Sequence, residues 1–96
     1  MQFAGLLKPQ PIEAAADVTA IVEYIRAQNR SAADRVAHTI YDGVGSLASF
    51  PNRGRSGRTK GTREFVFSPL PFIAVYRVKA EVVEIVRVLH GSQRWP

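Results

Sequence analysis

The chain has 96 residues, of which 46% are apolar and 22% charged, a composition typical of one small globular domain spanning 1–96. It has no cysteine, which excludes disulfides, thiolate zinc sites and a cysteine nucleophile, and its two histidines lie too far apart to predict a metal site. No stretch has the pattern of a signal peptide or of a membrane-spanning helix. We therefore expect a cytoplasmic protein with no cofactor, no bound metal and no membrane partner.

Positive charge is concentrated in the second half of the chain. The formal net charge is +5, and ten of the thirteen basic residues are arginine. Residues 1–50 carry four basic and five acidic side chains, whereas residues 51–96 carry nine basic and three acidic ones. Arginine pairs well with phosphates and carboxylates. The second half is therefore expected to face an acidic partner, which is either nucleic acid or an acidic protein segment.

The start of the chain predicts a short strand and then a helix. Residues 3–7 suit a strand, and Pro9 and Pro11 limit its length because proline has no backbone N–H to donate. Residues 13–28 carry apolar side chains at helical spacing, with acidic residues early and Arg26 late, as the helix dipole favours.

A second helix is predicted between Ser31 and Pro51. The Ser31 hydroxyl can cap its N-terminus, with Asp34 at the third helical position. About two residues separate it from the first helix, so the two are expected to form an antiparallel hairpin. Tyr24 and Tyr41 lie on these helices and are predicted to pack at the boundary of the core.

The remainder of the chain predicts a loop and three strands. Residues 52–61, here called the basic loop, are rich in glycine and arginine. Strands are predicted at 62–68, 72–78 and 82–89, the last apolar on both faces and therefore central, with a turn at 79–81. A helical hairpin followed by an antiparallel meander gives an α+β fold, to which the N-terminal segment can add a short strand.

Several motifs occur in a fixed order along the chain. They are the helical hairpin, Phe50-Pro51, the basic loop, Gly61-Thr62-Arg63-Glu64, Tyr76-Arg77-Val78, the block from Val83 to Gly91, and Trp95-Pro96. Together they resemble the RelE/ParE superfamily of type II toxins. The resemblance implies a toxin that its cognate antitoxin holds inactive in a hetero-oligomer. It leaves the target open, because RelE-like members cut messenger RNA on the ribosome, whereas ParE-like members poison DNA gyrase.

The residues needed to cut RNA are incomplete. RelE-like nucleases use lysines, arginines and a C-terminal tyrosine, and a sister group uses glutamate, histidine and tyrosine. Ile73 stands where those nucleases usually carry an arginine, and no tyrosine follows Tyr76. If the chain is a nuclease, it needs no metal, His90 is the candidate general base, and Arg63 and Glu64 are its candidate partners.

These three residues also have structural interpretations. His90 can bond backbone at the end of a strand and fix the tail, and Glu64 can be a solvated strand residue paired with Arg63. Arg77 and Arg87 lie among apolar neighbours and need water or an acidic partner, such as Glu84 or Glu64, because an unpaired buried charge is costly.

Binding to the antitoxin or the target is predicted for cations of the second half and for two further residues near the end of the chain. The tryptophan among them can instead pack as a lid near Tyr76. The predicted binding residues are Arg53, Arg55, Arg58, Lys60, Arg63, Arg77, Arg87, His90, Arg94 and Trp95.

The leading hypothesis is a ParE-like toxin that blocks DNA gyrase by binding rather than by catalysis. One alternative is a ribosome-dependent messenger RNA endonuclease, and another is an inert family member that only binds its antitoxin.

Overall fold

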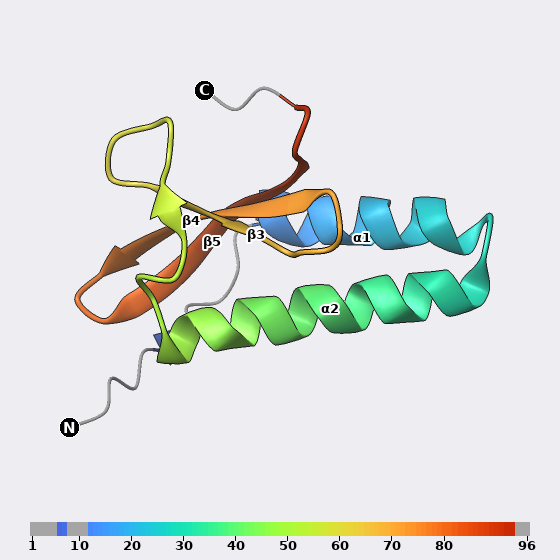
Figure 1. The fold of residues 1–96 in the computed structure, drawn as a ribbon, viewed down its shortest axis with the longest axis horizontal. Coiled ribbons are helices and arrows are strands. Elements are labelled where there is room, and N and C mark those ends of the chain that lie inside the picture. The colour runs from blue at the N-terminus through green and yellow to red at the C-terminus, as the bar shows by residue number, and fades with distance from the viewer. Residues whose placement is uncertain (1–5, 8–11, 94–96) are drawn as a thin grey trace.

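The computed structural model describes residues 6–7 and 12–93 (Figure 1). In chain order it contains β1 (Leu6–Leu7), α1 (Ile12–Arg26), α2 (Arg30–Ser49), β2 (Arg55–Ser56), β3 (Arg63–Val66), β4 (Phe72–Lys79) and β5 (Val82–His90). Figure 1 shows α1 and α2 side by side as an antiparallel hairpin packed against the sheet. The predicted α+β fold, with its N-terminal helical hairpin on an antiparallel meander, is confirmed. Neither helix among the described residues is long and apolar enough to cross a membrane.

The sheet has the strand order β1-β5-β4-β3-β2. β2 to β5 form the antiparallel meander, and β1 lies parallel to β5, with Leu6 opposite Val82 and Leu7 opposite Val83. The strand expected near the N-terminus is thus confirmed at 6–7, while residues 1–5 lie outside the described residues. β5 has strands on both sides, as its two apolar faces predict.

One apolar core joins the hairpin to the sheet. Gly43 of α2 lies against Phe67, and a Cβ at this position would come within 2.6 Å of the phenylalanine ring. This close approach explains a glycine inside a helix, where it costs about 1 kcal/mol relative to alanine. The core consists of Ala14, Val36, Ile40, Leu47, Phe67, Ala74, Tyr76, Val83, Ile85 and Val88.

The predicted cap of α2 is wrong. Asn29, not Ser31, is the N-cap: its backbone is extended and its side-chain oxygen accepts a hydrogen bond from the Ala32 N–H at 3.0 Å. Asparagine caps helices as well as serine does, so Asn29 serves as the cap and α2 begins at the next residue, Arg30. Ser31 lies within the first turn and is exposed.

Replacing Asn29 by alanine is expected to lower the free energy of unfolding by about 1 kcal/mol, because the cap hydrogen bond is lost. Ser31→Ala is the matched control, and we expect it to change the free energy by less than about 0.5 kcal/mol. Urea denaturation of the two variants measures both. A larger loss in the Ser31 variant would show that the serine supplies the cap.

The predicted boundary packing of Tyr24 and Tyr41 is also wrong, since their exposed fractions are 71% and 70%. Each residue of a helix is rotated by about 100° from the one before it. Tyr41 therefore points away from the buried Ile40, and Tyr24, two residues after the buried Val22, points to the opposite side of α1.

Candidate functional site

The basic loop folds back onto the sheet. Within it, Arg55 and Ser56 form β2, which pairs with β3 so that Arg55 lies opposite Glu64. The prediction of a plain loop therefore misses a two-residue strand, because glycines flank Arg55 and Ser56 and glycine has little strand preference. Beyond β2 the Gly57 N–H donates to the Thr62 carbonyl at 2.8 Å. Figure 1 shows this turn projecting beyond the sheet, away from α2.

Tyr76 of β4 anchors the start of the basic loop. Its side chain is fully buried, and its phenol donates to the Pro51 carbonyl at 2.7 Å and accepts from the Gly54 N–H at 2.9 Å. A Cβ at position 54 would lie 2.6 Å from the phenol oxygen, so this close approach requires glycine. Burial raises the pKa of the Tyr76 phenol, while the Gly54 hydrogen bond and the Arg63 charge lower it. The phenol is thus a neutral structural group, shielded from any target.

Arg63 and Glu64, at the start of β3, hold the same loop. Arg63 donates to the Gly54 carbonyl at 2.6 Å. The Glu64 side chain is 6% exposed, and its carboxylate accepts from the Arg55 guanidinium and from the Arg58 backbone N–H, both at 3.2 Å. The interpretation of Glu64 as a solvated residue paired with Arg63 is therefore wrong. The folded-back loop covers the carboxylate, and the residue opposite it in the register is its partner.

The cationic groups of the basic loop lie at its surface. Arg53 donates to the Ser46 hydroxyl at 3.0 Å, and its guanidinium carbon lies 5.0 Å from the centre of the Phe65 ring. The Arg55 side chain is 67% exposed despite its ion pair. Arg58 and Lys60 are exposed, and neither side chain has an ion pair or hydrogen bond to another described residue.

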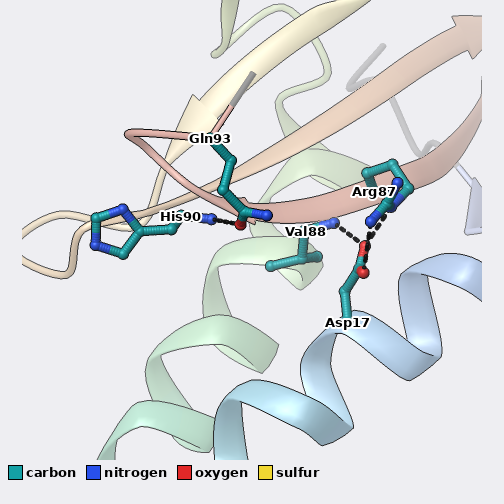
Figure 2. A network of polar contacts seen from close by, with 5 residues as sticks. All are labelled: Asp17, Arg87, Val88, His90 and Gln93. Atoms are coloured by element: carbon teal, nitrogen blue, oxygen red, sulfur yellow. Dashed lines mark hydrogen bonds and ion pairs between the residues drawn. The ribbon is translucent and has the colours of Figure 1, made fainter. Parts of the chain in front are cut away.

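Arg87 of β5 forms an ion pair with Asp17 of α1 (Figure 2). Its Nε and Nη2 atoms donate to the two carboxylate oxygens at 2.6 and 2.9 Å, and one of these oxygens also accepts from the Val88 N–H at 2.9 Å. These side-chain hydrogen bonds raise the pKa of Arg87. Asp17 was not among the predicted partners. The ion pair attaches α1 to β5, and it neutralises most of the Arg87 charge within the protein.

Arg77 of β4 keeps a more accessible charge. Its Nε lies 3.7 Å from the Glu84 carboxylate of β5, one of the predicted partners, and its side chain is 55% exposed. A long, exposed ion pair of this kind contributes little to stability. Arg77 thus differs from Arg87, although the sequence presents the two in similar surroundings.

His90 is exposed at the end of β5, and its ring points away from Asp17 and Arg87 (Figure 2). The His90 Nδ1 atom accepts from the Ser92 N–H at 3.1 Å and lies 2.7 Å from the Ser92 hydroxyl. The His90 backbone N–H donates to the side-chain oxygen of Gln93 at 2.8 Å. This is the geometry expected of a histidine that fixes the chain after the last strand.

The fold does not bring His90 together with Arg63 and Glu64. On β4, Phe72 pairs with His90 of β5, and Val75 pairs with Glu64 of β3. His90 and Glu64 are therefore three residues apart along the strand direction and two strands apart across the sheet. With standard strand dimensions this separates their backbones by roughly 14 Å. Arg94 and Trp95, the other predicted binding residues near the end of the chain, lie outside the described residues.

Two functional features of the fold escaped the sequence analysis. Asp17 is next to Val18, which belongs to the apolar stripe of α1. This neighbourhood is the signal in the sequence that the Asp17 side chain faces β5. For Tyr76, strand alternation places the side chain on the same face as Ala74 and so indicates burial. No local pattern shows which carbonyl its hydroxyl binds. Within the described part of the chain, no three His, Cys, Asp or Glu side chains are grouped to hold a metal ion.

Comparison with known proteins identifies the class to which this fold and surface belong. The family model for the ParE toxin of the type II toxin-antitoxin system parDE matches residues 13–95. The toxin Y4kP of Sinorhizobium fredii is 44% identical over 73 residues, covering 76% of this chain and 75% of that protein. The toxin RelE2 of Caulobacter vibrioides is 40% identical over 80 residues, covering 83% of this chain and 89% of that protein.

The fold has a counterpart among solved structures. A chain from the chromosomal ParDE TA system of P. aeruginosa superimposes with a TM-score of 0.82 at 27% identity, covering 92% of this chain and 97% of that one. The chain therefore belongs to the ParE toxin family of type II toxin-antitoxin systems. The predicted resemblance to the RelE/ParE superfamily is confirmed.

Proposed function

We propose that this toxin inhibits DNA gyrase by binding it, and that a cognate antitoxin neutralises the toxin in a hetero-oligomer. The observation that carries the proposal is the separation of His90 from Arg63 and Glu64 across the sheet. Cleavage of a phosphodiester bond needs an acid, a base and cations around a single phosphate. An inhibitor that only binds needs a shaped surface, and the basic loop offers one.

The chemistry around each member of the nuclease set supports the same proposal. Arg63 and Glu64 are occupied with the basic loop, and the Tyr76 phenol is buried. Ile73 of β4 is half-buried and uncharged, so it offers no cation to a phosphate. The antitoxin partner follows from the family, whose description pairs the toxin with an antitoxin, and the related solved structure is of a ParDE system.

The test is a gyrase supercoiling assay with the purified toxin, run beside messenger RNA cleavage on translating ribosomes. We expect inhibition of supercoiling without cleavage, and relief when the toxin is mixed with its antitoxin beforehand. Ribosomal cleavage with gyrase unaffected would contradict the proposal and assign the chain to the nucleases. The ribosomal arm is needed because the Caulobacter relative carries the name RelE2.

A further inference from the structure

We propose that the basic loop binds the phosphate backbone of double-stranded DNA, so that the toxin contacts gyrase and its DNA together. The inference rests on the proposed function, since gyrase is the partner that brings DNA. Its first support is charge: among the described residues, 50–93 carry eight basic and three acidic side chains, whereas the helical hairpin at 12–49 carries three basic and five acidic ones. This asymmetry orients the molecule with its basic loop toward a polyanion.

The second support is the fixed shape of the loop. Tyr76, Arg63 and Glu64 reach it from the sheet and bind its backbone at Gly54 and at Arg58. A surface that is ordered before binding loses less conformational entropy when its partner arrives. The loop is therefore a formed element of the fold, which distinguishes it from a solubilising segment.

The third support is the placement of the loop charges. Glu64, the acidic group closest to the loop in the register, is buried beneath it, whereas Arg55, Arg58 and Lys60 are exposed. The side chains of Arg58 and Lys60 have no acidic partner among the described residues, although the Arg58 backbone N–H donates to Glu64. Both side chains can therefore bind phosphates and release counterions from DNA without breaking an ion pair inside the protein.

The side chains of the loop favour DNA over an acidic protein segment. From Arg53 to Gly61 the loop contains arginine, lysine, serine, threonine and glycine, and no apolar side chain. Hot spots of protein interfaces are enriched in tryptophan, tyrosine and arginine, and of these the loop has only arginine. Phosphate contacts come from arginine, lysine and hydroxyl groups, all of which the loop has. Single strands bind by stacking on aromatic rings, which the loop lacks, so a duplex is the better fit.

The experiment measures binding of a short fluorescein-labelled DNA duplex to the purified toxin by fluorescence anisotropy, over a series of salt concentrations. The variant is Arg58→Ala/Lys60→Ala, and the matched control, Arg30→Ala/Arg35→Ala, removes the same charge from exposed positions of α2. We expect the loop variant to bind about tenfold more weakly at low salt, with the salt slope reduced by about two, and the control to change little. Arg58→Lys/Lys60→Arg should keep most of the binding, because it keeps the charge.

Equal loss in the two double-alanine variants would overturn the inference, because the effect would then be one of net charge. Absence of measurable DNA binding would overturn it as well, and so would stronger binding to a duplex of RNA with the same sequence. Glu64→Gln is an independent check, because it retains all surface cations and weakens only the contacts that hold the loop. Weaker DNA binding by this variant would support the inference that the shape of the loop contributes to binding.

A supercoiling assay on the same variants separates this inference from the proposed function. Loop-dependent DNA binding without gyrase inhibition by the unmodified toxin would support the DNA site and contradict the proposed function. Full gyrase inhibition by Arg58→Ala/Lys60→Ala would overturn the role of the loop and leave the proposed function standing. Parallel loss of DNA binding and gyrase inhibition supports both.

Discussion

Replacing Tyr76 by alanine is expected to lower the free energy of unfolding by about 3–5 kcal/mol, the range for removing a buried aromatic side chain. Tyr76→Phe keeps the ring and removes only the hydroxyl. It leaves the Pro51 carbonyl and the Gly54 N–H without their partner in a buried place, which should cost about 1–3 kcal/mol. Urea unfolding of both variants separates the packing of the ring from the hydrogen bonds of the phenol.

The control for the phenylalanine variant is Tyr41→Phe, which removes a hydroxyl from a tyrosine that is 70% exposed. We expect that change to stay within about 0.5 kcal/mol. If Tyr76→Phe is no more destabilising than Tyr41→Phe, the phenol does not hold the basic loop.

The phenol also predicts the direction of an alkaline effect. Because folding raises the pKa of Tyr76, the folded chain keeps the proton at pH values where the unfolded chain releases it. The resulting stabilisation is fully present below the ordinary tyrosine pKa of about 10 and is lost as the pH rises through the raised value. Unfolding free energies measured across this alkaline range should fall less steeply for Tyr76→Phe than for the unmodified chain. Parallel curves would contradict the assignment.

Replacing Asp17 by alanine is expected to lower the free energy of unfolding by about 2–4 kcal/mol. The carboxylate accepts two hydrogen bonds from Arg87 and one from the Val88 N–H, and its removal leaves a half-buried guanidinium without this acceptor. The range lies below that of a fully buried pair because the Arg87 side chain is 32% exposed and partly solvated. Urea unfolding measures the loss.

Two further variants make the Asp17 prediction specific. Asp17→Asn keeps an acceptor for the Val88 N–H but loses the charge, so its loss should be about half that of alanine. Glu23→Ala removes an exposed carboxylate from the same helix and should change stability by less than about 0.5 kcal/mol. An Asp17→Ala effect as small as that of Glu23→Ala would show that the ion pair adds nothing to the attachment of α1.

Side chains also bind two backbone N–H groups near the C-terminal end of β5. β1 covers this strand at Val82 and Val83 only, and beyond them the described residues place no strand on that side. Two backbone N–H groups along this stretch have side-chain acceptors instead, Asp17 for Val88 and Gln93 for His90 (Figure 2). These contacts attach the end of β5 to α1 and to the turn that follows the strand.

Much of the architecture followed from local patterns. Helical spacing of apolar residues predicted the hairpin, alternation predicted β3 and β4, and the two apolar faces of residues 82–89 predicted a strand inside the sheet. The motif order predicted the toxin family. These features depend on neighbours within one or two turns of a helix or along one strand, so the sequence alone determines them.

The tertiary structure alone decided what the polar residues do. Glu64 is buried because the basic loop folds over it, Asp17 meets Arg87 across 70 positions of the chain, and Tyr76 reaches the loop across 22 to 25 positions. Such contacts depend on how helices and strands pack, and no periodicity records which distant group lies within hydrogen-bonding distance. The same packing leaves the cations of Arg58 and Lys60 exposed to solvent, whereas it places Arg87 in an ion pair with Asp17.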